Sequence, residues 1–577
     1  MAEEGNRNPL ASNVPDFRPD LAFPRLTEEM VERLRPYGRE EVVPENLLLI
    51  AAGDRQVDMF VVLDGEITIS LPATDREVKI IAYYRRFDFT GELNMLNSQG
   101  SLVEARTIME SRILRVPRNE LQRLMRAEGD IANLITQATV WRRIGILAEE
   151  VGGVALMGRA GDAEMTELQR FFIRNNYPHR IVDLHDVAAL PDDGLTDVEP
   201  SLPAVVLADG RTLYRPTIAE LADELGITEL PDPEMIYDVA VVGAGPAGLA
   251  AAVYAASEGL CTIVIEDTAP GGQAGTSSKI ENYLGFPTGI SGHRLARRAQ
   301  LQALKFGVHF AISRQVVTAE QTEGIHKLTL AGGISARSRS VVVASGAQYR
   351  KLSVKNYGRF ENCGVYYAAT AMESLLCREK EVIVVGGGNS AGQAAVFLSG
   401  IAKHVHHLVR GKSLAATMSQ YLVSRIESSS RITLYTESEI VKLEGESSLE
   451  DVTWINRKTG ELTTKSNGRV FVMIGAEPNS GWLFGTVKLD KKGFILTGGT
   501  DGFEATPYAT SVPGMFAVGD VRSNSVKRVA SAVGEGSVVI SDVHRYLADH
   551  RNVFGAEPNS ALAALRSTSA LGVTTSK

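Results

Sequence analysis

Two glycine-rich turns of the same pattern constrain the fold of this chain more than any other feature. The first lies in "VAVVGAGPAGLAAA", where an apolar run is followed by Gly243, Gly245 and Gly248 and then by an alanine-rich segment. The apolar run predicts a buried parallel strand, and the segment after it predicts a helix. The first glycine permits the tight turn, the second lets the backbone approach a pyrophosphate, and the third lets helix and strand pack closely. We therefore expect a dinucleotide at the N-terminus of this helix.

An acidic residue follows this turn where a dinucleotide needs one. The next apolar run, residues 262–265, predicts a second strand and is followed by Glu266. A carboxylate about 20 residues after the glycines can accept a hydrogen bond from a ribose hydroxyl. One Gly-x-Gly-x-x-Gly sequence alone is weak evidence, but the order strand, turn, helix, strand and acid is specific. The sequence therefore predicts a dinucleotide-binding α/β fold.

The same pattern returns in "VIVVGGGNSAGQAAV", where Gly386, Gly388 and Ala391 take the three positions. Two such units on one chain imply two bound dinucleotides. No acid ends the second strand of this unit, and Arg410 and Lys412 follow it instead. Cations at this place suit a 2′-phosphate, which favours NADPH over NADH. The alternative is that both cations lie in a solvated loop.

Four further sequences extend the pattern across the C-terminal half of the chain. They are "GGQAGTSSKIENYLGFP" at 271–287, "VVVASGAQYRKL" at 341–352, "VFVMIGAEPNS" at 470–480 and "GMFAVGDV" at 514–521. With the two turns, they make the chain from about residue 235 to 550 resemble the low-molecular-weight thioredoxin reductases. The resemblance implies an α/β flavoprotein with two dinucleotide-binding domains, the NADPH domain being inserted into the FAD domain. It also implies a homodimer.

The resemblance implies which residues hold the two cofactors. Asp520 follows an apolar strand as an acceptor for ribityl hydroxyls, and the helix after it would direct its positive end at the flavin. Gln273 or Asn282 could instead cap a turn. The family carries a His-Arg-Arg run where this chain has "VRGK", so NADH stays an alternative to NADPH. The residues implied for FAD are Gly243, Gly245, Gly248, Glu266, Gly272, Gln273, Asn282 and Asp520, and those for NADPH are Gly386, Gly388, Asn389, Ser390, Ala391 and Arg410.

The redox dithiol of that family is missing. Thioredoxin reductases carry Cys-Ala-Thr-Cys and then Asp in the segment that aligns with "AATAM", where this chain has Ala368, Ala371 and Met372. Two thiols in this spacing form a disulfide that takes two electrons and passes them on through a thiolate. An alanine methyl does neither, and nothing in the spacing of Cys363 and Cys377 brings either onto the flavin. The sequence therefore identifies no catalytic residue.

Two dinucleotide sites without a dithiol predict an FAD-dependent NAD(P)H oxidoreductase. We expect NAD(P)H to reduce the flavin, and the flavin to pass electrons directly to a ferredoxin, a flavodoxin, a quinone or dioxygen. One alternative is a redox or nucleotide sensor with little turnover, in which cofactor occupancy changes the arrangement of the N-terminal domains. Another is a thioredoxin-disulfide reductase, as the family name suggests, which needs an external thiol.

The N-terminal part resembles the cyclic nucleotide-binding fold, a β jelly roll with a lid helix. Short apolar strands alternate with turns in "NLLLIAAGDRQVDMFVVLDGEITISL", and a long helical run follows them. The phosphate-binding segment of that family begins Gly-Glu-Leu, matched by Gly91, Glu92 and Leu93, and Glu92 would meet the ribose hydroxyl. The arginine that holds the cyclic phosphate falls on Val103. Binding of cAMP or cGMP and a role as a scaffold or a sensor of another effector both stay open.

A second small domain resembles thioredoxin. The order strand, helix, strand, and then Pro203 before a hairpin is typical of that fold, but no cysteine pair precedes the first helix in "MGRAGDAEM". We expect a docking or spacer role. The predicted divisions are a tail over 1–22, the cyclic nucleotide-binding-like domain over 23–150, the thioredoxin-like domain over 151–231, the FAD-binding domain over 232–350 and 481–553, the NAD(P)H-binding domain over 351–480, and a disordered tail over 554–577.

Composition excludes several other classes of protein. The chain has 60 Lys+Arg against 69 Asp+Glu, a formal net charge of -9, which argues against nonspecific binding to nucleic acid. Its three cysteines are too few and too scattered for a disulfide framework or a metal site. No charge-free run of 18 apolar residues and no basic start before an apolar run occurs, so we expect neither a membrane span nor a signal peptide, and a cytoplasmic location.

Overall fold

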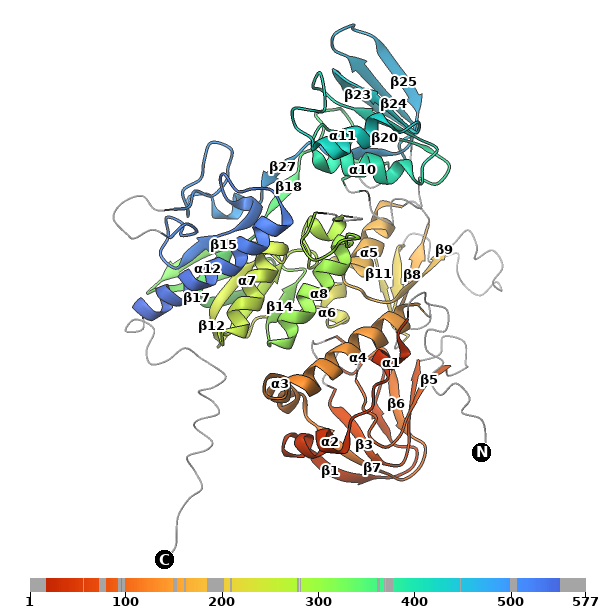
Figure 1. Cartoon of the computed structure of the whole chain (residues 1–577), viewed down its shortest axis with the longest axis vertical. Coiled ribbons are helices and arrows are strands. Elements are labelled where there is room, and N and C mark those ends of the chain that lie inside the picture. The colour runs from red at the N-terminus through yellow and green to blue at the C-terminus, as the bar shows by residue number, and fades with distance from the viewer. Residues whose placement is uncertain are drawn as a thin grey trace, which may run out of the picture.

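The computed structural model describes the chain from residue 17 to residue 550 with internal gaps. Glu92, Cys363, Ala368, Ala371, Met372 and the predicted tail 554–577 lie outside the described residues. Figure 1 shows the N-terminal strands at the bottom, a small and a large sheet across the middle, and the teal elements at the top. The gaps are 56, 72–78, 92–94, 96–98, 149–152, 160–161, 184–201, 208–209, 278–279, 281, 361–363, 368, 370–376, 447 and 499–505.

The N-terminal strands form a roll of two antiparallel sheets. The sheet orders are β1-β7-β3 and β2-β6-β4-β5. Apolar side chains fill the roll, as in β4, whose five residues are all buried. The elements are α2 Glu28–Leu34, η1 Arg35–Tyr37, β1 Arg39–Val43, β2 Leu48–Ile50, β3 Met59–Asp64, β4 Ile67–Leu71, β5 Lys79–Tyr84, β6 Glu104–Thr107, β7 Ser111–Val116, α3 Arg118–Ala127 and α4 Gly129–Ala148.

Helix α1 (Pro19–Ala22) lies within the segment predicted as a tail and packs on α4. Ala22 is fully buried, and the ring of Phe17 meets that of Trp141 edge-on, with centroids 5.9 Å apart. The carbonyl oxygen of Ala22 accepts a hydrogen bond from Arg142 Nε over 2.8 Å. The packed part of the chain therefore begins before residue 23, because contacts with a distant helix hold this segment.

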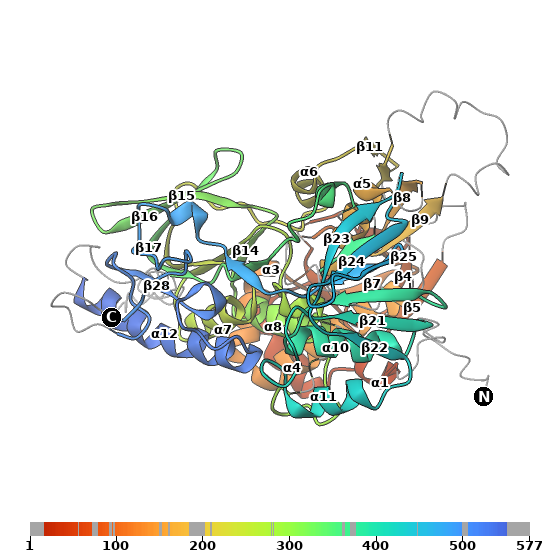
Figure 2. The same ribbon diagram turned by 90° about the horizontal axis from the view of Figure 1, so that it is seen from above.

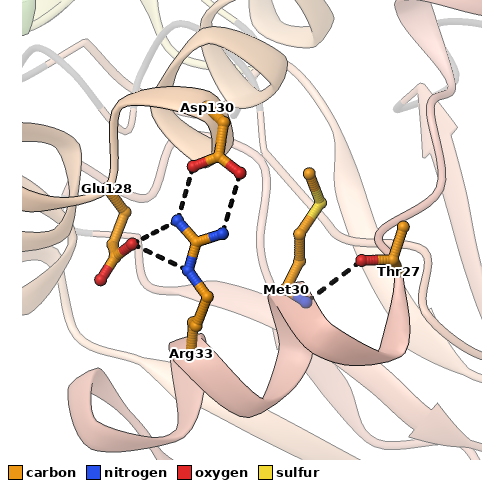
Figure 3. Close-up of polar contacts among 5 residues, drawn as sticks. All are labelled: Thr27, Met30, Arg33, Glu128 and Asp130. Carbon is orange, nitrogen blue, oxygen red and sulfur yellow. Dashed lines mark hydrogen bonds and ion pairs between the residues drawn. The ribbon is translucent and has the colours of Figure 1, made fainter.

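An arginine of α2 fixes that helix to the junction of α3 and α4 (Figure 3). Arg33 Nε donates to Glu128 Oε2 over 3.0 Å, and its Nη1 donates to Asp130 Oδ2 over 2.9 Å. The hydrogen bond from Arg33 lowers the pKa of Asp130 to about 2. Thr27 caps the N-terminus of α2, its hydroxyl accepting from the backbone N–H of Met30 over 3.2 Å. The start of α4 is thus held against the helix that precedes the roll.

The next part of the chain is a small mixed sheet in the order β11-β10-β8-β9. Strands β8 and β9 are parallel, and β10 runs antiparallel to both of its neighbours. The peptide bond between Leu202 and Pro203, just before β10, is cis. The elements are β8 Val154–Gly158, α5 Ala163–Arg174, β9 His179–Asp183, β10 Ala204–Val206, β11 Thr212–Tyr214 and α6 Ile218–Glu224.

The large central sheet contains the first glycine turn. Its order is β14-β13-β12-β17-β16-β15, and β28, from near the end of the chain, pairs in parallel with β17. Helices α7 and α12 pack against each other beside this sheet, as Figure 2 shows from above. The elements are β12 Ile236–Val242, α7 Pro246–Ser257, β13 Thr262–Glu266, η6 Ala274–Thr276, α8 Gly292–Lys305, β14 His309–Ile312, β15 Val316–Thr322, β16 Ile325–Leu330, β17 Ser335–Val343, β28 Met515–Ala517, η9 Gly519–Val521 and α12 Val529–Asp549.

The second glycine turn lies in an inserted parallel sheet of order β19-β26-β20-β21-β22, accompanied by an antiparallel sheet β23-β24-β25. Antiparallel strands β18 and β27 carry the chain into and out of this insertion. The elements are β18 Ala347–Tyr349, η7 Tyr357–Arg359, β19 Val365–Tyr366, β20 Glu381–Val385, α10 Asn389–Ser399, β21 His404–Leu408, α11 Gln420–Glu427, β22 Ile432–Tyr435, β23 Ser438–Glu444, β24 Asp451–Asn456, β25 Leu462–Ser466, β26 Val470–Val472, β27 Ala476–Pro478 and η8 Gly481–Leu483.

None of the helices that the structure describes could span a membrane. Each of them is too short or too polar to cross a bilayer.

Candidate nucleotide-binding sites

The first glycine turn joins the end of β12 to the start of α7. Gly243 has a φ of 104°, and a Cβ there would collide with the carbonyl oxygen of Ala344. A Cβ at Gly248 would collide with the carbonyl oxygen of Gly243. At Gly245 the nearest atom to such a Cβ is the Cα of Gly272, 4.0 Å away, so packing does not require glycine. Gly245 instead leaves the backbone at the N-terminus of α7 open to a phosphate group.

The second glycine turn, between β20 and α10, also has one glycine that packing requires and one that leaves open space. Gly386 has a φ of 144°, and a Cβ there would collide with the carbonyl oxygen of Met473. Gly388 is the N-cap of α10, and a Cβ there would have no neighbour within 4 Å. Ala391 is fully buried against the turn. In both turns, the first glycine is required by the fold, and the second one leaves room for a ligand.

Glu266 lies at the end of β13 beside the first turn. It is 7% exposed, and its Oε2 accepts a hydrogen bond from the backbone N–H of Ala244 over 2.7 Å. Its Oε1 accepts from the N–H groups of Thr268 and Ala269 over 3.2 and 3.3 Å. Burial, with the nearby Asp267 carboxylate, raises the pKa of Glu266. The structure thus brings the predicted acid to the predicted glycines, with hydrogen-bond acceptors at the edge of the turn.

The loop after β13 approaches the same turn. A Cβ at Gly272, which has a φ of 52°, would lie 3.0 Å from the Cα of Gly245. The side-chain amide of Gln273 donates to the carbonyl oxygen of Ala347 and so ties the loop to β18. Asn282 is exposed. Gly272 is therefore at the site, Gln273 has a structural partner, and the cofactor roles of Gln273 and Asn282 stay predictions.

Asp520 lies in η9, after β28. Burial raises its pKa, and Lys527 opposes this effect. The sequence analysis did not identify Glu535 and Arg522 in this region. Glu535 Oε2 accepts a hydrogen bond from the N–H of Gly519 over 2.7 Å, and Arg522 Nη2 donates one to Glu535 Oε1 over 2.6 Å. Glu535 thereby holds the turn that carries Asp520. The signal in the sequence was a carboxylate among small and apolar residues of a helix.

The predicted NADPH residues lie at the end of the inserted sheet. Asn389 Oδ1 accepts hydrogen bonds from Ser419 N over 2.7 Å and Ser419 Oγ over 2.9 Å, which fixes the start of α10. Ser390 is exposed on the same turn. Arg410 follows the end of β21 and is exposed, as is Lys412. The structure places two exposed cations beyond the carboxyl end of β21, which agrees both with binding of a 2′-phosphate and with a solvated loop.

The two described cysteines are unsuited to redox catalysis. Cys377 is fully buried. Burial raises the pKa of Cys261 to about 11, which keeps its thiol protonated at neutral pH. The described residues therefore offer no thiolate that could act as a redox group.

Helix α5 of the small mixed sheet contacts both halves of the flavoprotein part, through residues that the sequence analysis did not single out. Arg174 Nη2 donates to the carbonyl oxygen of Ala269 over 3.2 Å. His293 Nε2 lies 3.1 Å from the carbonyl oxygen of Ile173. The guanidinium carbon of Arg170 lies 6.0 Å from the ring centroid of Tyr366, in the inserted domain. The small sheet is thus docked onto the loop that leads to Gly272.

Among the described residues, the cation that lines the interior of the N-terminal roll is Arg142 of α4, and not a residue at the place of the family's arginine. Val103, at the place of the family's arginine, is 7% exposed and lines this interior. Arg106 donates to the carbonyl oxygen of Asn46 over 3.2 Å. The cavity inside the roll has a volume of about 20 Å³. This is roughly the space of one water molecule, far less than a cyclic nucleotide occupies. Gly91 is described, with a φ of 135°, and also lines the cavity.

Comparisons with known proteins agree with this geometry. Residues 237–536 match the family model described as pyridine nucleotide-disulphide oxidoreductase, and residues 40–128 match that of the cyclic nucleotide-binding domain. A thioredoxin reductase of Mycolicibacterium smegmatis is 34% identical over 316 residues, which are 55% of this chain and 98% of that protein. An NADH dehydrogenase of Bacillus subtilis (strain 168) is 31% identical over 338 residues, which are 59% of this chain and 64% of that protein. The crystal structure of Lactococcus lactis thioredoxin reductase matches with a TM-score of 0.50 and 29% identity, over 54% of this chain and 99% of that chain.

Proposed function

The chain belongs to the pyridine nucleotide-disulphide oxidoreductase family, and we propose that it is an NAD(P)H oxidoreductase that passes electrons from FAD directly to an external acceptor. Its thioredoxin reductase-like relatives use FAD and NADPH. The observation that carries the proposal is the replacement of both thiols by Ala368 and Ala371 in a chain that keeps both glycine turns. Without the dithiol, electrons have to leave the flavin by another route.

The residues of the two turns fit the two cofactors. We propose that FAD binds at Gly243, Gly245, Gly248, Glu266, Gly272 and Asp520, with further contacts from Gln273 and Asn282. We propose that the nicotinamide nucleotide binds at Gly386, Gly388, Asn389, Ser390, Ala391 and Arg410. When bound, FAD supplies the capacity to accept a hydride from the nicotinamide and to release two electrons. The relative named as an NADH dehydrogenase supports NADH as the alternative donor.

We propose the classes of electron acceptor from the number of electrons that each one takes. The pair of electrons can reduce one quinone, one dioxygen to hydrogen peroxide, or two molecules of a one-electron carrier such as a ferredoxin or a flavodoxin. The chain is proposed to work as a homodimer, as the family resemblance implies.

The domain divisions support this proposal. We infer that the FAD-binding domain covers 232–350 and 481–553, with the NAD(P)H-binding domain inserted over 351–480, because β28 returns to the sheet of β17 after the insertion. We also infer that residues 151–231 form a thioredoxin-like domain, since β8, α5 and β9 make a parallel unit and the antiparallel β10 pairs with β8. Its Asp162-capped helix α5 has no cysteine, so a docking role is proposed for it.

An anaerobic titration of the purified protein with NADPH and with NADH tests the proposal. We expect at least one nicotinamide to remove the absorbance of oxidised FAD, and a ferredoxin, a flavodoxin, a quinone or dioxygen to restore it. Failure of both nicotinamides to reduce the bound flavin would refute the proposal. Thioredoxin-coupled disulfide reduction at ordinary enzyme rates would refute the direct route and support the reading by family name.

A further inference from the structure

A histidine is buried beside the second glycine turn, at a position where the first turn has an apolar residue. His407, on β21, is fully buried, and its Nε2 lies 2.8 Å from the carbonyl oxygen of Gly386. In the register of the parallel strands, His407 pairs with Val384 of β20. The corresponding pair in the first unit is Val264 with Val241, and Val264 is fully buried as well. The histidine is therefore a particular feature of the second turn.

This histidine costs more free energy to bury than an apolar side chain does. A carbonyl oxygen only accepts hydrogen bonds, so Nε2 carries the proton and Nδ1 is an unprotonated acceptor. Among the described residues, the buried Nδ1 has no hydrogen-bond partner, which lowers stability. Burial lowers the pKa of His407, which keeps its ring neutral. What this histidine supplies, and a valine could not, is the hydrogen bond to Gly386.

A second side chain holds the next carbonyl group of the same turn. Thr417 Oγ1 donates to the carbonyl oxygen of Gly387 over 2.7 Å. Thr417 lies between β21 and α11, two residues before Ser419, whose N–H and hydroxyl donate to Asn389. Two successive carbonyl groups of the turn are thus hydrogen-bonded to side chains that come from elsewhere in the chain.

Holding these carbonyl groups fixes the direction of the N–H groups that follow them. In a trans peptide, the C=O and N–H bonds point in opposite directions, and neither of these two peptide bonds is cis. The N–H groups of Gly387 and Gly388 therefore point away from His407 and Thr417. Within the described part of the chain, neither N–H donates a hydrogen bond. The second turn thus presents two adjacent donors at the start of α10.

The first turn uses the corresponding N–H group differently. There the N–H of Ala244, at the place of Gly387, donates to the Glu266 carboxylate over 2.7 Å. In the second unit the residue at the place of Glu266 is Val409, whose side chain has no acceptor. The N–H of Gly387 is therefore left for a ligand. Successive backbone N–H groups at the N-terminus of a helix bind anions such as a pyrophosphate.

We propose that His407 and Thr417 are positioning residues for the nicotinamide nucleotide. By holding two carbonyl groups of the turn, they direct the N–H groups of Gly387 and Gly388 at its pyrophosphate. A carbonyl group that accepts a hydrogen bond also makes the N–H of its own peptide a stronger donor. The inference rests on the proposed function, because it takes this turn as the nicotinamide site. Since the pyrophosphate is remote from the hydride that is transferred, the two residues support binding and not the chemical step.

Isothermal titration calorimetry of the FAD-loaded, full-length protein with ADP-ribose tests the proposal. ADP-ribose has the pyrophosphate but no nicotinamide, so it binds without reducing the flavin. Stopped-flow reduction of the FAD by NAD(P)H gives the concentration for half-maximal rate and the limiting rate separately. His407→Leu and Thr417→Val each remove one donor at a similar side-chain volume. We expect each variant to bind ADP-ribose about fivefold more weakly and to raise the half-maximal concentration equally, with a limiting rate within about twofold of wild type.

Thr417→Ser is the matched control, because it keeps the hydroxyl and should bind ADP-ribose as the wild type does. His407→Leu should melt no lower than the wild type, since it removes the unpaired Nδ1. If it does not melt cooperatively, the two Thr417 variants decide the matter.

Three results would overturn the proposal. They are wild-type ADP-ribose binding in Thr417→Val or in a folded His407→Leu, an equal loss of binding in Thr417→Ser and Thr417→Val, and a lower limiting rate at unchanged half-maximal concentration. Absence of ADP-ribose binding by the wild-type protein would also overturn it. The proposed function fails by a different result, which is that neither nicotinamide reduces the bound FAD.

Discussion

The guanidinium of Arg174 donates a hydrogen bond to the carbonyl oxygen of Ala269 over 3.2 Å. This contact joins the last residue of α5 to the loop that runs from Glu266 to Gly272. The N–H of Ala269 also donates to Glu266 Oε1 over 3.3 Å, so one residue of the loop links the cysteine-free segment to the predicted ribose acceptor. A segment without cysteines is thus joined by hydrogen bonds to the predicted flavin site.

Replacing Arg174 tests that connection. We expect Arg174→Ala to release FAD several-fold faster than the wild-type protein does, because a hydrogen bond from a charged donor stabilises the loop by about 1 kcal/mol or more. The rate is measured from the recovery of FAD fluorescence after dilution. Arg180→Ala, at an exposed position on β9 of the same domain, is the control and should release FAD at the wild-type rate. Equal rates for both variants would show that the contact does not support the site.

A substitution at Gly245 tests whether this glycine is needed for cofactor binding and not for folding. A Cβ at this position fits, since its nearest neighbour is 4.0 Å away. We therefore expect Gly245→Ala to fold with a Tm close to that of the wild-type apoprotein and to bind FAD at least about tenfold more weakly. Gly248→Ala is the matched contrast, because its Cβ collides with the turn and should lower the Tm by several degrees. Wild-type FAD affinity in Gly245→Ala would contradict the assignment.

The sequence predicted the two nucleotide units because their signals are local. In each unit, the strand, the positive-φ glycine and the helix follow one another along the chain, as Gly243 and Gly386 show. The contacts of Arg174 with Ala269, and of Arg142 with Ala22, join segments that are distant in sequence. No periodicity encodes such pairs, since they depend on how finished elements dock. The same limit applies to Gln273, whose side-chain amide donates to the carbonyl oxygen of Ala347 in the distant strand β18.

Gly388 offers the corresponding test in the inserted domain. Because a Cβ there meets no atom within 4 Å, Gly388→Ala should keep its FAD and its Tm. It should raise the nicotinamide concentration needed for half-maximal flavin reduction about tenfold, since the nucleotide phosphates approach the N-terminus of α10. Arg410→Ala made alongside it distinguishes the donors. If NADPH is preferred through Arg410, this variant loses affinity for NADPH and keeps its affinity for NADH.

His326 predicts a pH dependence of stability. Burial lowers its pKa to about 4, below the value of about 6.5 in an unfolded chain. The unfolded state therefore binds a proton at a higher pH than the folded state does, and stability is lost as the pH falls from about 6.5 towards 4. Between pH 7.5 and 5 this amounts to about 2 kcal/mol. Urea unfolding of wild type and His326→Gln measures it. We expect the variant to lose less stability over this range, and parallel profiles would contradict the assignment.

A variant without cysteines tests the route by which electrons leave the protein. We expect the triple variant Cys261→Ser, Cys363→Ser and Cys377→Ala to turn over within about twofold of the wild-type rate with the best acceptor found. The reason is chemical: Ala368 and Ala371 cannot form a disulfide, Cys377 is buried, and the raised pKa of Cys261 keeps its thiol protonated. Steady-state NAD(P)H oxidation measures the rate, with bound FAD counted in each sample so that losses of cofactor are not read as losses of catalysis. A fall of tenfold or more at full flavin content would mean that a thiol carries the electrons after all. The single variant Cys363→Ser would then identify whether the cysteine nearest in sequence to Ala368 is the carrier.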